Sequence, residues 1–267
     1  MFGKAIATFF SVSRDLIARG LIRIHVTPNK LSLAGMMLTL GAGICYALGA
    51  GRAFAWEFGI HGATSAYLLG AGVLLILASA CDMLDGAVAR IGKQASKFGA
   101  FLDSTLDRFS DFVIYAGIAV FYAARPEANV TAVALAMLAF FNGFMISYSR
   151  ARAEDIIEHC SVGYWQRGER NAAVLIATFA HNIPALVVQQ AILPMFTVLR
   201  RMGHTHAVLA GKTPIAHPRE GGFWMKIRLW RYPRMSWAYD VVTGVNIAWL
   251  IFAPVKIPDV LGQLLRG

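Results

Sequence analysis

Six apolar stretches, each close to the length of a membrane-spanning helix, divide this chain. A helix needs about 20 mostly apolar residues to cross the hydrocarbon core of a bilayer. The six stretches run over residues 31–50, 63–80, 109–124, 130–148, 172–199 and 238–255. In lipid, backbone polar groups must be satisfied within the spanning structure itself, which favours helices for segments of this length. The sequence therefore predicts an all-α fold, a polytopic membrane bundle of six transmembrane helices.

The composition supports a membrane solvent. Hydrophobic residues make up 57% of the 267 residues and charged residues 15%, and the mean hydropathy is +0.55. A soluble protein of this length could not enclose so much apolar surface in its core, whereas lipid can cover apolar side chains on the outside of a helix bundle. We therefore expect a single membrane domain over residues 1–267.

The flanks of the apolar stretches carry further expectations. Residues 1–27 predict an interfacial amphipathic helix, because Arg14, Arg19 and Arg23 recur at a helical spacing among apolar residues. A solvated helix that packs on the domain fits this pattern nearly as well. Within the fifth stretch, Pro184 and Pro194 are expected to kink the helix.

The formal charge of +10 does not indicate a nucleic-acid partner. Lys and Arg are concentrated in the short connections between apolar stretches, where cytoplasmic loops and anionic headgroups attract them. The connections at residues 90–108 and 149–170 are the richest in Lys and Arg. The positive-inside rule therefore orients these two connections toward the cytoplasm.

The sequence predicts a basic polar insert over residues 200–236, which does not fit a topology of six membrane helices with a cytoplasmic N-terminus. Eight Lys and Arg lie between Arg200 and Arg234, although a count of six helices would put this stretch outside. Either the fifth stretch does not cross simply, or the insert lies along the interface. His204 and His206 are expected to be solvated surface side chains.

The most informative segment contains four aspartates. Asp82 and Asp85 are three residues apart, and Asp103 and Asp107 are four apart, so each pair projects from one face of a helix. The connection at residues 92–97 is short enough to make the two helices antiparallel neighbours. The sequence therefore predicts that the four carboxylates converge.

Four carboxylates so close together need positive charge between them. Like charges repel, and each unpaired carboxylate in or near a membrane is costly to desolvate. Mg²⁺ typically binds one or two carboxylates together with phosphate oxygens of a substrate, and two such ions can clamp a phosphate during its transfer. Asp82, Asp85, Asp103 and Asp107 are therefore candidate metal ligands. Structural ion pairs or a cation pathway, as in a divalent-cation transporter, are the alternatives.

Small residues accompany the aspartates. Gly86 follows Asp85, Ala89 lies one turn later, and Gly99 lies one turn before Asp103, so a ligand can approach the backbone closely. Arg90 offers a planar guanidinium for phosphate oxygens.

These positions resemble, without a departure, the signature D-x2-D-G-x2-A-R-x8-G-x3-D-x3-D of the CDP-alcohol phosphotransferases. The resemblance implies six membrane helices, an interfacial N-terminal helix, a homodimer and an active site on the cytoplasmic side of the cell membrane. It also implies that two ions, Mg²⁺ or Mn²⁺, are held by Asp82, Asp85 and Asp103, with Asp107 completing the site. Asp107 would act as the general base, so that the acceptor oxygen attacks the β-phosphorus of the CDP-lipid and CMP leaves. The implied nucleotide-binding residues are Asn29, Asp85, Gly86, Ala89, Arg90 and Gly99.

Two further strings, at Ser96–Arg108 and Ser147–Glu154, together with Gly168-Glu169-Arg170, resemble phosphatidylinositol-phosphate synthases and their archaetidylinositol-phosphate relatives. This resemblance implies a CDP-diacylglycerol or CDP-ether lipid donor and inositol phosphate as the acceptor. A dianionic acceptor needs several fixed cations. The candidate acceptor-binding residues are Arg108, Ser147, Arg150, Arg152 and Arg170. Arginines at cytoplasmic helix ends are equally expected from topology alone, and glycerol phosphate, serine or a neutral amino alcohol are alternative acceptors.

Overall fold

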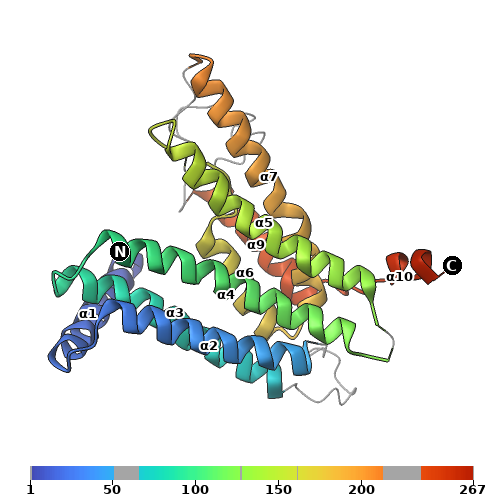
Figure 1. Ribbon diagram of the computed structural model, residues 1–267, viewed down its shortest axis with the longest axis horizontal. Helices are drawn as coiled ribbons and strands as arrows, with labels where there is room; N and C mark the ends of the chain where they lie inside the picture. Colours follow the sequence, from blue (N-terminus) through green and yellow to red (C-terminus); the bar gives the residue numbers. More distant parts are fainter. Residues whose placement is uncertain (1, 51–65, 127, 161, 213–235, 267) are drawn as a thin grey trace.

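A computed structural model describes residues 2–50, 66–126, 128–160, 162–212 and 236–266, with side chains described from residue 11 onward (Figure 1). Within these ranges the chain forms helices and no strands, which confirms the predicted all-α fold. The helices are α1 (Phe2–Arg23), α2 (Pro28–Gly49), α3 (Ala66–Ile91), α4 (Lys97–Ala123), α5 (Val130–Glu154), α6 (Arg167–Phe179), α7 (Ile183–Leu209), α9 (Trp237–Phe252) and α10 (Val260–Arg266).

Several of these helices are long and apolar enough to cross a membrane. In the described part of the chain they are α2, α3, α5 and α7, and α9 is a shorter apolar helix of 16 residues. The third predicted stretch falls in α4, whose N-terminal half carries charged residues of the aspartate motif. A polytopic helical membrane protein is therefore confirmed, while the count of six spans stays a prediction.

The helices form two groups, which meet where α4 packs against α5 and where α6 lies between them. In Figure 1, α2, α3 and α4 lie together, with α2 packed against both of the others. α5 packs along α7, and α6 contacts α3 on one side and α7 and α9 on the other. α2 and α4 approach very closely where Gly43 meets Gly117. The distance is so short that a Cβ at Gly117 would overlap the backbone of Gly43. Small residues at helix crossings allow this close packing in lipid.

The turn between α3 and α4 follows the sequence prediction. α3 ends at Ile91, and α4 begins at Lys97 after Ser96, whose side chain accepts a hydrogen bond from the Gly99 N–H at 2.9 Å. This N-cap satisfies a backbone donor that has no partner within the helix. The chain thus reverses over residues 92–96 and carries the two aspartate pairs to the same end of the bundle.

The fifth predicted stretch is wrong as a single kinked helix. α6 ends at Phe179, His181 has a positive φ of 54°, and α7 begins at Ile183. Pro184 lies in the first turn of α7, where its missing N–H has no intrahelical acceptor to lose. Pro184 therefore begins a helix and does not kink one.

Pro194 does lie inside α7, and a side chain from α5 compensates for it. A proline cannot donate to the carbonyl four residues earlier, which here is that of Gln190. The buried Asn142 side chain donates from α5 to the Ala191 carbonyl at 2.7 Å and to the Gln190 carbonyl at 3.4 Å. This contact between helices pairs a backbone group that the proline leaves without a partner.

The predicted basic insert begins later than residue 200. α7 continues to Leu209, and Arg201 is buried, where it donates to the Ile146 carbonyl and to Gln166 Oε1 at 3.1 Å. His204 is also buried, with Nε2 3.2 Å from the His159 carbonyl oxygen, so its assignment to the solvated surface is wrong. Residues 213–235 of the insert lie outside the described residues.

α1 packs on the end of the bundle that carries the aspartates. Its Ala18 is buried against Ala87 and Val88 of α3, while Leu16 and Ile17 remain exposed. One face of α1 thus contacts protein and another exposes apolar side chains. The interfacial placement of this helix stays a prediction.

Candidate functional site

A cavity of about 340 Å³ opens between α3 and α4, with α2 and α6 completing its wall. It contains the four aspartates of the motif and one more from α4, so the predicted convergence is observed. The lining carboxylates are Asp82, Asp85, Asp103, Asp107 and Asp111. α2 packs against both α3 and α4 and holds these two helices on opposite sides of the cavity. α3 and α4 contact each other little, so the space between them stays open.

Three of the carboxylates form a tight group. Asp82, Asp85 and Asp103 each place one oxygen within 4.8 Å of the others. Asp85 is buried, and the Ser32 hydroxyl of α2 donates to its Oδ2 at 2.6 Å, which fixes the orientation of this carboxylate. Three converging carboxylate oxygens are a donor set that suits a hard divalent cation. These residues fit the metal site expected from the sequence.

Asp107 lines the same cavity but has cationic partners. Its Oδ1 accepts a hydrogen bond from Arg167, and its Oδ2 lies 3.7 Å from an Arg108 nitrogen. The side chain is buried, so these two guanidinium groups compensate a charge that water reaches poorly. Asp107 therefore lies beside the group of three, held by arginines from α4 and α6.

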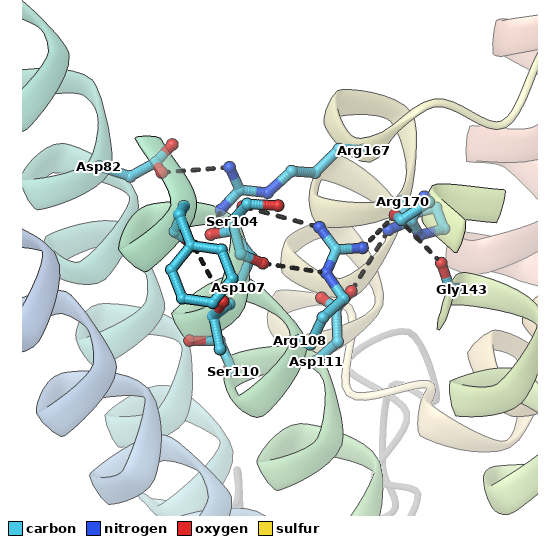
Figure 2. Close-up of polar contacts among 12 residues, drawn as sticks. Asp82, Ser104, Asp107, Arg108, Ser110, Asp111, Gly143, Arg167 and Arg170 are labelled. Atoms are coloured by element: carbon cyan, nitrogen blue, oxygen red, sulfur yellow. Dashed lines mark hydrogen bonds and ion pairs between the residues drawn. The ribbon is translucent and has the colours of Figure 1, made fainter. Parts of the chain in front are cut away.

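Arg167, the first residue of α6, is the feature that sequence reasoning missed (Figure 2). Its Nη1 donates to Asp82 Oδ1 at 3.1 Å, and its Nη2 donates to Asp107. Burial alone would lower the pKa of this guanidinium, but the charges of Asp107, Asp82 and Asp111 more than offset burial and raise it. The available clue was that Arg167 lies three residues before Arg170, hence on the same helical face.

The predicted nucleotide-binding residues gather where α2 begins, α3 ends and α4 begins. A Cβ at Gly99 would lie 3.5 Å from Asn29 Oδ1, so these two residues of α4 and α2 are neighbours. The Arg90 guanidinium lies beside Gly86, with Nη1 3.3 Å from the position of a Cβ there. Of the six predicted residues, Asp85 alone lines the cavity, and Asn29, Gly86, Ala89, Arg90 and Gly99 lie outside its lining.

The predicted acceptor residues fall into two sets. Arg108 of α4 donates to Ser147 of α5. Arg170 of α6 donates to Asp111 Oδ2 of α4 at 3.3 Å (Figure 2). These contacts bring α4, α5 and α6 together. Arg170 is 5% exposed, and its Nη1 has no partner within the described residues.

Arg150 and Arg152 form the second set. Arg150 pairs with Glu154 at 2.9 Å, and Arg152 pairs with Asp155 at 3.1 Å. Both arginines are exposed near the end of α5 and lie outside the lining of the cavity. The structure therefore groups Arg108, Ser147 and Arg170 beside Asp107 and Asp111, whereas Arg150 and Arg152 pair with acidic residues of their own segment. None of the five predicted acceptor residues belongs to the lining of the cavity.

Residues 25–210 match the family model described as CDP-alcohol phosphatidyltransferase, which covers most of the chain, including the whole motif. The chain belongs to the CDP-alcohol phosphatidyltransferase family. Its reaction class is therefore the transfer of the substituted phosphate group of a CDP-activated alcohol to an acceptor hydroxyl, with release of CMP.

Curated relatives of this CDP-alcohol phosphatidyltransferase share a narrower description. The archaetidylinositol phosphate synthase of Pyrococcus horikoshii is 33% identical over 189 residues, which are 70% of this chain and 88% of that protein. The phosphatidylinositol phosphate synthase of Cutibacterium acnes is 36% identical over 162 residues, 60% of this chain and 70% of that protein.

Solved structures share the fold. The phosphatidylinositol phosphate synthase of Mycobacterium tuberculosis with CDP-DAG bound is 25% identical, with a TM-score of 0.60 over 72% of this chain and 92% of that chain. The same enzyme in complex with manganese and citrate also gives a TM-score of 0.60, over 72% of this chain and 88% of that one. Among the described residues of this transferase, the group of three carboxylates is the candidate for binding a metal ion.

Proposed function

We propose that this transferase moves the phosphatidyl group of a CDP-activated lipid, CDP-diacylglycerol or a CDP-ether lipid, to a hydroxyl of inositol phosphate and releases CMP. One observation carries the acceptor assignment: Arg108 contacts both Asp107 and Ser147, and Arg170 contacts Asp111, one turn beyond Asp107 on α4. Clustered guanidinium groups are suited to a phosphate dianion. The relatives named above support the same acceptor class.

We assign the metal site to Asp82, Asp85 and Asp103, with Asp107 completing it, and two Mg²⁺ or Mn²⁺ ions as the cofactor. The three converging carboxylate oxygens support this assignment. Divalent ions at this place would neutralise charge on the diphosphate of the CDP-lipid. Ser32 would orient Asp85 through its hydrogen bond, because residues that contact the ligands tune a metal site.

Asp107 is assigned as the general base. Its carboxylate takes the proton of the acceptor hydroxyl as that oxygen forms a bond to the β-phosphorus. The bond between the β-phosphorus and the bridging oxygen breaks, and the electron pair leaves with CMP. Arg167 and Arg108 contact the two oxygens of Asp107, which restricts its rotation and holds it at the cavity wall. A base held in one orientation lowers the entropic cost of reaching the reactive geometry.

The remaining assignments concern binding and location. Asn29, Asp85, Gly86, Ala89, Arg90 and Gly99 would bind the CDP moiety, and Arg108, Ser147, Arg150, Arg152 and Arg170 would bind the acceptor phosphate. The basic connections support a cytoplasmic orientation of the site in the cell membrane. We also propose a single domain over residues 1–267 that assembles as a homodimer.

An acceptor panel tests this function. Purified enzyme in lipid nanodiscs is given radiolabelled CDP-diacylglycerol and Mg²⁺, with inositol phosphate, inositol, glycerol phosphate or serine. We expect CMP release with inositol phosphate and little with the others. If glycerol phosphate or serine supports release and inositol phosphate does not, the acceptor assignment is wrong.

Two variants sharpen the panel. Arg170→Gln should raise the KM for inositol phosphate about 10-fold or more, because it removes a charge-assisted hydrogen-bond donor. Arg125→Gln is the matched control, because Arg125 lies over the Phe121 ring at the far end of α4. An equal rise in KM for both variants would show that Arg170 does not bind the acceptor.

A further inference from the structure

Arg167 contacts the carboxylate cluster, although it belongs neither to the aspartate motif nor to the residues proposed to bind the metal ions or the substrates. Its guanidinium joins Asp82 of α3 to Asp107 of α4, and the side chain comes from the first turn of α6. Among the described residues, Arg167 is the sole cationic side chain within ion-pair distance of Asp82. Asp82 belongs to the group of three carboxylates, so Arg167 uses an oxygen of a residue that the metal site requires.

The surroundings of the pair allow it to open. The side chains of Arg167 and Asp82 are 36% and 41% exposed, so water reaches both. Asp107, the other partner of Arg167, is only 12% exposed and also has Arg108 nearby. The contact with Asp82 is therefore the weaker of the two, since solvent screens an exposed ion pair more than a buried one.

We propose that Arg167 is an exchangeable counter-ion of the carboxylate cluster: it neutralises Asp82 in the metal-free enzyme and must release that carboxylate for a divalent cation to bind. This inference rests on the proposed metal site and adds a positioning residue to it. In the released state Arg167 keeps its contact with Asp107, and its freed nitrogen faces the cavity that receives the substrate. The guanidinium thus limits cation binding before substrate arrives.

Cation affinity without substrate measures this exchange. Free Mn²⁺ is followed by electron paramagnetic resonance while purified enzyme in detergent is titrated, and no lipid or nucleotide is present. Arg167→Gln should bind Mn²⁺ about 5- to 10-fold more tightly than wild type, since the cation no longer displaces a charge-assisted hydrogen bond. Arg167→Lys keeps the charge and should stay within about threefold of wild type.

Arg90→Gln controls for the general effect of removing a nearby positive charge. Among the described residues, Arg90 forms no ion pair with a carboxylate, although it lies on the same helix as Asp82 and Asp85. It should gain less than about threefold in Mn²⁺ affinity, as expected for a screened charge. Equal gains in Arg90→Gln and Arg167→Gln, or no gain in the latter, would overturn the exchange.

A wild-type measurement keeps the inference testable if Arg167→Gln does not fold. Phenylglyoxal modifies accessible arginines, and peptide mass spectrometry gives the rate at each one. Mn²⁺ should increase the rate at Arg167 and leave the rate at Arg152, which pairs with Asp155 away from the cavity, unchanged. An unchanged or lower rate at Arg167 would overturn the inference. If the wild-type enzyme binds no Mn²⁺ at all, the proposed metal site is wrong, and the exchange that rests on it is wrong as well.

Discussion

Replacing Asp103 by Asn should make the metal-free enzyme more stable while it removes the metal site. Asp103 has two carboxylate neighbours, Asp82 and Asp85, with one oxygen of each within 4.8 Å of the others. Two unit charges at this distance repel by about 3.5 kcal/mol at an effective dielectric constant of about 20, and by about 0.9 kcal/mol in bulk water. Asp103 therefore contributes about 2 to 7 kcal/mol of repulsion through its two neighbours.

The net effect is smaller than this repulsion. Arg167 and Arg108 attract Asp103, and that attraction is lost with the charge. Solvent also screens the pair with Asp82, whose side chain is 41% exposed. We expect a net gain of about 1 to 2 kcal/mol in the free energy of unfolding of metal-free enzyme. For a chain of this size that gain raises Tm by about 2 to 6 °C.

The assay is thermal unfolding of purified enzyme, followed by intrinsic fluorescence in EDTA and again in Mn²⁺. Wild type should gain Tm on adding Mn²⁺, because a ligand that binds only the folded state stabilises it. Asp103→Asn should start higher in EDTA and gain less. Glu158→Gln, which changes an exposed carboxylate outside the cavity, is the matched control and should leave both temperatures unchanged. A lower Tm of Asp103→Asn in EDTA would refute the electrostatic reasoning.

Three further substitutions test single contacts. Asp107→Asn should lower CMP release about 10²- to 10⁴-fold, the usual contribution of a general base, and a rate within tenfold of wild type would remove that assignment. Ser32→Ala should raise the Mn²⁺ concentration for half-maximal activity about 10-fold, because Asp85 loses the hydroxyl that orients it; an unchanged metal requirement would contradict this role. Asn142→Leu should lower the free energy of unfolding by about 1 to 2 kcal/mol in detergent, since two buried carbonyls beside Pro194 lose their donor. Wild-type stability in Asn142→Leu would show that these carbonyls find another donor.

The sequence was sufficient where local periodicity and strong turn residues act together. The spacing of Asp82, Asp85, Asp103 and Asp107 predicted two helix faces, and the short connection between them predicted the chain reversal. Both are observed, because Ser96 caps α4 and residues 92–96 leave no room for another element. The convergence of the carboxylates also needs α2, which packs against both aspartate helices.

The sequence was insufficient where tertiary contacts decide. Pro184 is compatible with a kink inside a helix and with the first turn of a new one, and hydropathy does not distinguish the two. The buried positions of Arg201 and His204 depend on acceptors from distant parts of the chain, the carbonyls of Ile146 and His159. The polar residues from Arg200 to Leu209 therefore looked like the start of a solvated insert, although they form the last part of α7 and include buried side chains.

Arg167 illustrates the same limit within the site. A single arginine at the start of a helix has many possible partners, and only the packing of α6 against α3 brings it to Asp82. Membrane topology alone also predicts arginines at cytoplasmic helix ends, so the sequence could not distinguish two kinds of arginine. Arg108 and Arg170 contact aspartates of α4. Arg150 and Arg152 pair with acidic residues three or four positions later.

Anomalous diffraction from crystals soaked in Mn²⁺ tests the metal centre most directly, because it locates the ion without reference to activity. We predict a manganese peak bounded by the carboxylates of Asp82, Asp85 and Asp103, with the Arg167 guanidinium moved away from Asp82. A peak elsewhere in the protein, with these three side chains making no contact to it, would contradict the account.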